Sequence, residues 1–247
     1  MSRGVLHVVG IGPGDAGGVT GRALEALRGC DLIVGYDTYV ELASRLAPGV
    51  RTASTPMTRE VERCRMALEQ ASAGADVALV CSGDAGVYGM ASPVLELAAD
   101  FPDVEVDVVC GVSAAQSAAA LLGAPLGHDF ATVSLSDRLT PWDVIERRLR
   151  ACVGADMCLV LYNPRSRGRS EHLARAARAM LDAGASEHTV CGWARAVGRS
   201  GQACGTLELG ELGGLDADMF TTVFVGNSAT RLVLGRMVTP RGYGGLR

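Results

Sequence analysis

The sequence predicts an α/β protein with two domains, a mostly parallel sheet in the first domain and a mixed sheet in the second. Three observations predict this class. Short apolar runs of strand length alternate with segments of helical periodicity along the chain. Serine, threonine, proline and glycine mark the ends of the helical segments. A stretch rich in glycine and proline, residues 123–127, divides the pattern into predicted domains of residues 1–122 and 128–247.

The first half is predicted as strands joined by helices. Apolar runs predict buried strands at residues 5–11, 32–34, 77–80 and 104–109. Helical periodicity predicts helices at residues 20–28, 58–72, from 92 onward and 113–122. Gly29 stops the first helix, Ser92-Pro93 begins the third, and Ser113 with Gln116 forms a capping box on the fourth. This alternation predicts a mostly parallel sheet covered on both faces.

The second half repeats the alternation and then departs from it. Strands are predicted at residues 130–134, 158–161 and 190–194. Helices are predicted from Thr140-Pro141 onward and over residues 170–183. Two later runs, residues 202–207 and 220–225, are predicted as strands of a different, antiparallel kind. Because the two halves are of similar size, we expect a ligand cleft between them.

Composition excludes several classes of protein. The chain has 247 residues and a net charge of −4, which argues against a nucleic-acid scaffold. No apolar run approaches the length of a membrane span, and no signal-peptide pattern opens the sequence, so a cytoplasmic protein without a membrane partner is expected. All 23 basic residues are arginine, which excludes a phosphate-loop lysine and a Schiff-base lysine. Eight cysteines lack Cys-x-x-Cys spacing, so we expect buried thiols and neither a metal nor an iron–sulfur cluster.

The loop Gly10–Asp15 nearly matches a dinucleotide-binding fingerprint and then breaks it. Asp15 stands where the third glycine belongs, and Pro13 removes a backbone N–H that should donate to phosphate. Such a loop disfavours an anion and suits a cofactor with positive charge, such as S-adenosylmethionine (SAM). A tight turn without a ligand is the alternative. A dinucleotide-dependent oxidoreductase is a rival interpretation, which Asp37 near the end of the second strand supports.

Further motifs carry a family resemblance. They are Ser82-Gly83-Asp84-Ala85-Gly86-Val87-Tyr88, Gly111-Val112-Ser113-Ala114, residues 127–142, Tyr162-Asn163-Pro164-Arg165-Ser166 and Gly226-Asn227-Ser228. With the Gly10–Asp15 loop, they resemble the tetrapyrrole methylases, the SAM-dependent enzymes of cobalamin and sirohaem synthesis, over essentially the whole chain. Residues 127–142 and the Tyr-Asn-Pro run resemble the precorrin-3B C17-methyltransferase branch.

The resemblance implies a homodimer that binds SAM in the interdomain cleft. It places the glycine-rich loop on the tetrapyrrole side of the cleft and the second domain on the SAM side. The SAM contacts that it implies are Pro13, Ser82, Gly83, Asp84, Val87, Ser113, Ala114, Tyr162, Arg195 and Ala196. The expected substrate contacts are Gly12, Gly14, Asp15, Tyr88, Arg138 and Arg165.

The reaction that the resemblance implies is methylation of C17 of precorrin-3B with ring contraction to precorrin-4. Contraction requires a base near the C20 hydroxyl and donors for a leaving lactone carboxylate. The candidates, left unranked, are Asp15, Asp84, His128, Ser136 and Asp137. Purely structural roles stay open: Asp84 and Ser113 as caps, Tyr88 and Tyr162 as packing residues, His128 as a loop residue. Another precorrin methylase and a non-catalytic tetrapyrrole carrier are the remaining alternatives.

Overall fold

The computed structural model describes residues 4–243 except 167 and 169. The chain divides into two compact units, residues 1–114 and 115–247. The division falls one helix earlier than the 123–127 linker of the sequence analysis. The reason is that helix α5 (Ala114–Leu122) packs its small residues against strands of the second unit, including Val160 and Phe224.

The first unit is a five-stranded parallel sheet in the order β3-β2-β4-β1-β5, as predicted for this half. Its strands are β1 (Val5–Gly10), β2 (Leu32–Tyr36), β3 (Arg51–Thr55), β4 (Val77–Cys81) and β5 (Glu105–Val109). Its helices are η1 (Ala16–Gly18), α1 (Gly21–Gly29), α2 (Asp37–Leu46), α3 (Glu60–Ser72), α4 (Ala91–Leu97) and η2 (Ala98–Asp100).

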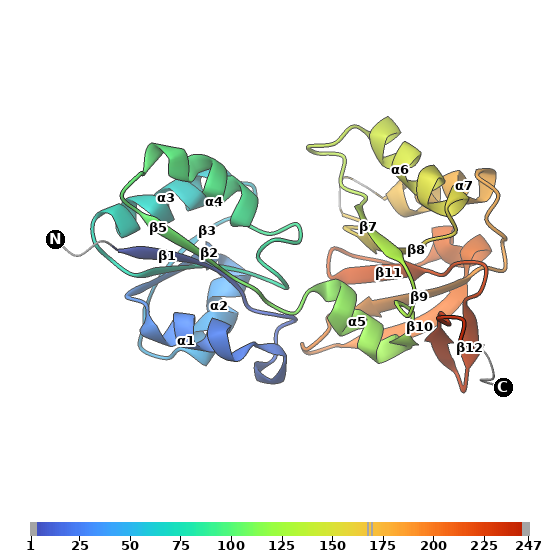
Figure 1. Cartoon of the computed structure of the whole chain (residues 1–247), viewed down its shortest axis with the longest axis horizontal. Coiled ribbons are helices and arrows are strands. Elements are labelled where there is room, and N and C mark those ends of the chain that lie inside the picture. The colour runs from blue at the N-terminus through green and yellow to red at the C-terminus, as the bar shows by residue number, and fades with distance from the viewer. Residues whose placement is uncertain (1–3, 167, 169, 244–247) are drawn as a thin grey trace. The chain divides into compact units, whose positions relative to one another are not determined.

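Two layers of helices cover this sheet (Figure 1). Helices α1 and α2 bury Leu27 and Ala43 against one face, together with Ile33 and Val80 of the strands. Helices α3 and α4 bury Leu68 and Val94, among others, against the other face. Strand β4 is fully buried, which is why its sequence Val-Ala-Leu-Val-Cys is apolar throughout rather than alternating.

The second unit contains a mixed sheet in the order β10-β9-β11-β8-β7. Strands β7 and β8 pair parallel, whereas β11 runs antiparallel to both β8 and β9. The remaining elements complete the unit. They are β6 (Gly123–Ala124), β7 (Phe130–Ser134), α6 (Trp142–Gly154), β8 (Cys158–Tyr162), α7 (His172–Asp182), β9 (Val190–Arg195), β10 (Ala203–Glu208), η3 (Leu209–Gly214), β11 (Thr221–Val225), β12 (Arg231–Val233) and β13 (Arg236–Val238).

Helices α6 and α7 pack on one face of the mixed sheet, where Leu149 and Met180 meet Leu161 and Val223. Helix α5 packs on the other face. The antiparallel strands predicted at residues 202–207 and 220–225 are confirmed as β10 and β11. Within the described residues, no helix is long and apolar enough to cross a bilayer.

Candidate functional site

The carboxyl ends of the parallel strands form one edge of the first unit's sheet, and the predicted ligand loops lie along it. Strands β1 and β4 are neighbours. The chain leaves β1 for α1 on one face, and it leaves β4 for α4 on the other. This divergence is a topological switch point, the place where open α/β sheets bind ligands. The two loops that meet there are Gly10–Asp15 and Ser82–Tyr88.

Glycine is required in these loops because backbones pack against one another. Gly12 N donates to Gly83 O at 3.0 Å, and Gly83 N donates to Gly12 O at 2.8 Å. A Cβ at Gly10 would stand 2.6 Å from Gly83 O, and one at Gly111 would stand 2.2 Å from the same oxygen. Gly12 and Gly83 also have φ of +69°, a conformation that disfavours any side chain. The glycines therefore allow the ends of β1, β4 and β5 to pack directly against one another.

Asp84 holds this junction through its carboxylate. Oδ1 accepts hydrogen bonds from Gly86 N at 2.8 Å and Val87 N at 3.1 Å, and Oδ2 accepts one from Gly111 N at 3.0 Å. One side chain thus caps its own turn and ties the β4 loop to the β5 loop. The capping role that was left open for Asp84 is observed, while its contact with a cofactor stays a prediction.

Asp15 also has a structural role. It is the N-cap of η1, where its Oδ1 accepts a hydrogen bond from Gly18 N at 2.8 Å. Its side chain lies at the surface. Gly14, the residue before it, has φ of +138°, a value that L side chains rarely adopt.

The remaining predicted residues of this unit lie in the same loops. Val87 and Tyr88 follow Asp84 and expose 37% and 53% of their surface. Tyr88 has φ of +53°, a strained conformation for an aromatic residue. Ser113 is buried, and Ala114 begins α5. A Cβ at Gly83 would stand 3.6 Å from Ser113 Cα and Ala114 N, so the β4 and β5 loops are in contact distance.

In the second unit, the strand directions place most of the predicted site residues at one edge of the mixed sheet. Strands β7 and β8 are parallel, and β9 runs in the same direction because β11 is antiparallel to both β8 and β9. The carboxyl ends of all three strands therefore share an edge. The predicted residues found there are Ser136, Asp137, Arg138, Tyr162, Arg165, Arg195 and Ala196.

Hydrogen bonds fix the ends of β7 and β8. Ser134 Oγ accepts from Asn163 Nδ2 at 3.0 Å and from Ser136 N at 3.2 Å. The Tyr162 hydroxyl accepts a hydrogen bond from Ala115 N at 2.9 Å, in the first turn of α5. That bond satisfies one of the backbone donors that a helix leaves unpaired at its start. Asn163 and Ala196 have φ of +53° and +50°, so strained backbone follows both β8 and β9.

His172 is a residue at this edge that the sequence analysis missed. Its Nε2 lies 2.9 Å from Asp137 Oδ2, and its side chain is 9% exposed. The contact is close but poorly aligned, because neither ring nitrogen has a hydrogen-bond partner among the described residues. Trp142 meets the His172 ring edge-on at 5.1 Å, and the Arg175 guanidinium lies 4.1 Å from the Trp142 ring centre. No sequence signal singled out His172, because the glutamate and histidine opening α7 resemble any solvated helix start.

His128 lies at the opposite edge of this sheet. It precedes β7, so the strand, about 13 Å long, separates it from Ser136 and Asp137. Its Nδ1 accepts a hydrogen bond from Asp129 N at 2.8 Å. Asp156 lies at the same edge as His128, and hydrogen bonds from the Ser228 hydroxyl and backbone hold the pKa of Asp156 below its ordinary value. The five catalytic candidates therefore do not form one cluster.

Among the described residues, no group of three or more histidine, cysteine or carboxylate side chains could hold a metal ion. Cys30, Cys64, Cys81, Cys158 and Cys191 are buried, whereas Cys110 and Cys204 are exposed. Burial raises the pKa of the Cys81 thiol to about 11 and that of Cys191 to about 12. These two thiols are therefore protonated at neutral pH and unsuited to nucleophilic chemistry.

The switch-point loops fit a compact ligand that carries apolar groups. Val87 and Tyr88 expose apolar surface, and both oxygens of Asp84 accept backbone hydrogen bonds. In the loops Gly10–Asp15 and Ser82–Tyr88 there is no lysine or arginine to bind a pyrophosphate. Loops without a basic side chain are poorly suited to the pyrophosphate of a dinucleotide.

Fold and loops together define a class of α/β protein whose glycine-rich loops lie at the carboxyl edge of a parallel sheet. The model of the family described as Tetrapyrrole (Corrin/Porphyrin) Methylases matches residues 5–213. The chain belongs to this family.

Relatives and solved structures agree with this assignment. The chain is 48% identical to a probable cobalt-factor III C(17)-methyltransferase of Salmonella typhimurium, covering 97% of this chain and 99% of the relative. It is 39% identical to a precorrin-3B C(17)-methyltransferase of a Sinorhizobium species, covering 98% of each. The crystal structure of the methyltransferase CobJ superposes with a TM-score of 0.88 at 38% identity, over 96% of this chain and 100% of that one.

Proposed function

We propose that this chain transfers a methyl group from SAM to C17 of a cobalamin precursor and contracts its macrocycle. The observation that carries the proposal is the 48% identity to a C17-methyltransferase over nearly the full length of both chains. The strained, hydrogen-bonded loops at the carboxyl edges of both sheets support a catalytic function over a simple carrier function.

Two forms of the substrate are candidates. Precorrin-3B is the metal-free form, and it is the substrate expected from the sequence motifs. Cobalt-factor III is the cobalt-containing form named for the Salmonella relative, whose identity of 48% exceeds the 39% of the precorrin-3B enzyme. We therefore propose the cobalt form as the second candidate and treat its metal as part of the substrate.

We propose that SAM is held by backbone and small side chains at these edges. In the first unit the proposed contacts are Pro13, Ser82, Gly83, Asp84, Val87, Ser113 and Ala114; in the second they are Tyr162, Arg195 and Ala196. When bound, SAM supplies a methyl group already activated by its positively charged sulfur. The protein's contribution is to orient the acceptor carbon and to exclude water.

We propose Asp137 as the base that takes the proton from the C20 hydroxyl, with Ser136 as a neighbouring donor. What favours Asp137 over Asp15 and Asp84 is the imidazole beside it, because His172 Nε2 lies 2.9 Å from Asp137 Oδ2. His128 is less suited because it lies at the opposite edge of its sheet. Asp137 is a surface carboxylate at the carboxyl edge, and the buried His172 beside it is a natural acceptor or donor for the transferred proton.

Substrate carboxylates are proposed to bind to Arg138 and Arg165. Arg138 is exposed in the loop after β7, and Arg165 follows β8 with Asp216 Oδ1 at 3.8 Å. An ion pair that long, with Asp216 itself almost fully exposed, leaves the guanidinium able to exchange its partner for a substrate carboxylate. In the first unit, Gly12, Gly14, Asp15 and Tyr88 stay the proposed contacts to the macrocycle.

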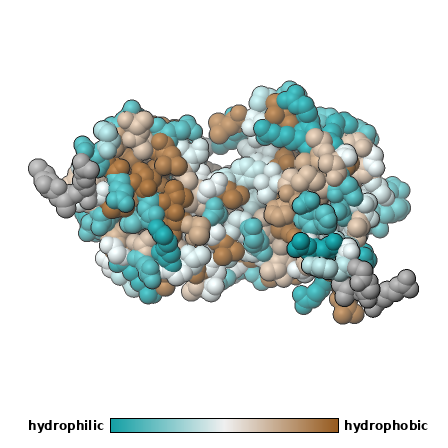
Figure 2. All heavy atoms as spheres, in the orientation of Figure 1, coloured by the Kyte–Doolittle hydropathy of each residue, from teal (hydrophilic) through white to brown (hydrophobic). Residues whose placement is uncertain are grey.

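We also propose a cytoplasmic homodimer. Figure 2 shows hydrophobic surface on the first unit over β5 and α4, where Leu95 is 52% and Val108 is 41% exposed. Strand β5 is an edge strand of its sheet, so this apolar surface adjoins unpaired backbone groups. Light scattering should report twice the chain mass of 25.6 kDa. A mass equal to that of one chain would contradict the dimer.

Methyl transfer from isotopically labelled SAM tests the proposed function. The purified chain is incubated with precorrin-3B or cobalt-factor III in parallel reactions, and the products are analysed by mass spectrometry. We expect one labelled methyl group on the tetrapyrrole in at least one reaction. Binding of the tetrapyrrole without transfer would indicate a carrier, and binding of NADH in a fluorescence titration would favour the oxidoreductase.

A further inference from the structure

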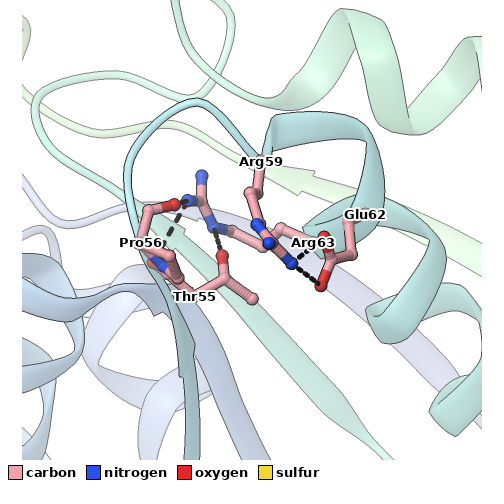
Figure 3. Close-up of polar contacts among 5 residues, drawn as sticks. All are labelled: Thr55, Pro56, Arg59, Glu62 and Arg63. Atoms are coloured by element: carbon pink, nitrogen blue, oxygen red, sulfur yellow. Dashed lines mark hydrogen bonds and ion pairs between the residues drawn. The ribbon is translucent and has the colours of Figure 1, made fainter.

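Arg63 is a buried cation without a carboxylate partner. The residue is 4% exposed and lies in the first turns of α3. Its Nε donates to Thr55 Oγ1 at 2.9 Å, and its Nη2 donates to Pro56 O at 3.0 Å and to Thr55 O at 3.4 Å (Figure 3). All three acceptors are neutral. Among the described residues, no carboxylate oxygen lies within 4.0 Å of this guanidinium.

This arrangement is electrostatically incomplete. Buried charges in proteins are normally paired with an opposite charge, because desolvation of an isolated ion is expensive. The start of a helix is also the unfavourable end of the helix dipole for a cation. One terminal nitrogen of Arg63 makes no hydrogen bond to a described residue and carries no dashed line in Figure 3. An anion placed beside it would relieve both costs.

Arg63 lies close to the carboxyl edge of the first unit's sheet. Thr55 ends β3, and in the sheet register it pairs with Tyr36 at the end of β2. Two inter-strand spacings, about 10 Å, separate β3 from β4 and its Ser82–Tyr88 loop. The β3 loop is also strained, because Thr58 is β-branched and has φ of +74°. Arg63 bonds the two carbonyls at the start of that loop and so holds it in place.

Resting on the proposed function, we infer that Arg63 and the loop after β3 form a carboxylate subsite for a peripheral side chain of the tetrapyrrole. The shared chemistry is a carboxylate, which SAM also carries. The lateral distance favours the tetrapyrrole, because its carboxylates radiate from a wide macrocycle whereas SAM is proposed at the β1–β4 switch point. The guanidinium would bind the carboxylate through its remaining terminal nitrogen.

The same loop offers a matched control. Arg59 lies four residues before Arg63, but it is exposed and already paired: its Nη1 lies 2.9 and 3.1 Å from the two carboxylate oxygens of Glu62 (Figure 3). The pair Arg63→Met and Arg59→Met therefore removes one buried, unpaired cation or one exposed, paired cation from adjacent turns. Circular dichroism and thermal unfolding establish that each variant is folded.

The test measures three quantities for the wild type and both variants. They are the dissociation constant of uroporphyrin III, a polycarboxylated porphyrin, by fluorescence; the dissociation constant of SAM by calorimetry; and KM for the methylated substrate. We expect Arg63→Met to weaken uroporphyrin binding and raise KM by about 10- to 100-fold, with SAM affinity unchanged. Arg59→Met should leave all three within about twofold of the wild type.

The outcomes separate this inference from the proposed function. A folded Arg63→Met variant that binds uroporphyrin as the wild type does would overturn the subsite alone. Weakened SAM binding with unchanged uroporphyrin binding would assign Arg63 to the SAM carboxylate and overturn the inference. A wild type that neither binds uroporphyrin nor transfers methyl would overturn both. Should Arg63→Met fail to fold, Arg63→Lys carries the same test, because lysine keeps the charge without the planar fork that bonds loop and ligand together.

Discussion

Asp84 Oδ2 and Gly111 N are joined by a hydrogen bond of 3.0 Å that spans 27 residues of sequence and connects the loops after β4 and β5. The other carboxylate oxygen accepts from two further backbone N–H groups, of Gly86 and Val87. The side chain therefore shapes the loop that is proposed to hold SAM. The shape of this loop and its affinity for SAM should therefore depend on the same carboxylate.

Changing Asp84 to alanine should destabilise the protein by about 1–3 kcal/mol and weaken SAM binding, because three backbone donors lose their acceptor. Urea unfolding measures the first effect and calorimetry the second. Asp216→Ala is the matched control, since that side chain is 94% exposed. Unchanged stability in Asp84→Ala would contradict the structural role. Full stability loss with an unchanged SAM dissociation constant would remove Asp84 from the cofactor site.

Asp15 should tolerate asparagine and not alanine. Both aspartate and asparagine accept the Gly18 N–H at the N-cap, whereas alanine cannot, so Asp15→Ala should cost about 1 kcal/mol and Asp15→Asn much less. Turnover should survive in Asp15→Asn. Loss of turnover in that variant, with stability and SAM affinity intact, would instead make this carboxylate part of the chemistry.

Asp137→Asn should lower kcat by about 10²- to 10⁴-fold, because an amide cannot accept the hydroxyl proton. SAM affinity and the thermal midpoint should stay at the wild-type values. His128→Asn serves as the control at the opposite sheet edge, where the amide oxygen can replace Nδ1 as acceptor for Asp129 N. Loss of turnover in His128→Asn, with turnover retained in Asp137→Asn, would contradict the assignment of Asp137 as the base.

Much of this fold could be predicted because the buried strands are recognisable as apolar runs in the sequence. Strands β1, β4 and β8 are apolar runs, and Pro and Gly mark the helix ends near them. Strand β3, Arg-Thr-Ala-Ser-Thr, was not predicted because an exposed edge strand needs no apolar run. Helix α2 and the hairpin β12–β13 were also missed. The hairpin turn uses Leu234 and Gly235 at positive φ, and leucine gives no turn signal.

The loops of the candidate site could be predicted from the sequence, whereas the contacts between its residues could not. Motif resemblance located the loops at strand ends. It could not show that Asp84 bonds Gly111, that His172 lies beside Asp137, or that Arg63 lacks a carboxylate, because each relationship joins segments distant in sequence or depends on burial. His128 stood among the candidates with Ser136 and Asp137, since sequence distance does not reveal which edge of a sheet a loop occupies.

Asp156 should contribute to stability in a pH-dependent way. Hydrogen bonds from the Ser228 hydroxyl and backbone lower its pKa in the folded state. The stabilisation is therefore present above the ordinary aspartate pKa, about 3.9, and is lost as pH falls through the folded pKa. The stability difference between wild type and Asp156→Asn should be seen near neutral pH and shrink in acid. A stability difference that stays the same from neutral pH into acid would contradict this role of Asp156.

Carbon NMR of the product formed with ¹³C-methyl SAM tests the central claim most directly. The wild-type chain is incubated with precorrin-3B or cobalt-factor III, and the position of the labelled carbon is assigned on the isolated tetrapyrrole. We predict one labelled methyl group on C17 and a contracted macrocycle, which for precorrin-3B, with its C20 hydroxyl, carries C20 in an acetyl group. A label on any other ring carbon, or a macrocycle that keeps C20 in the ring, would contradict it.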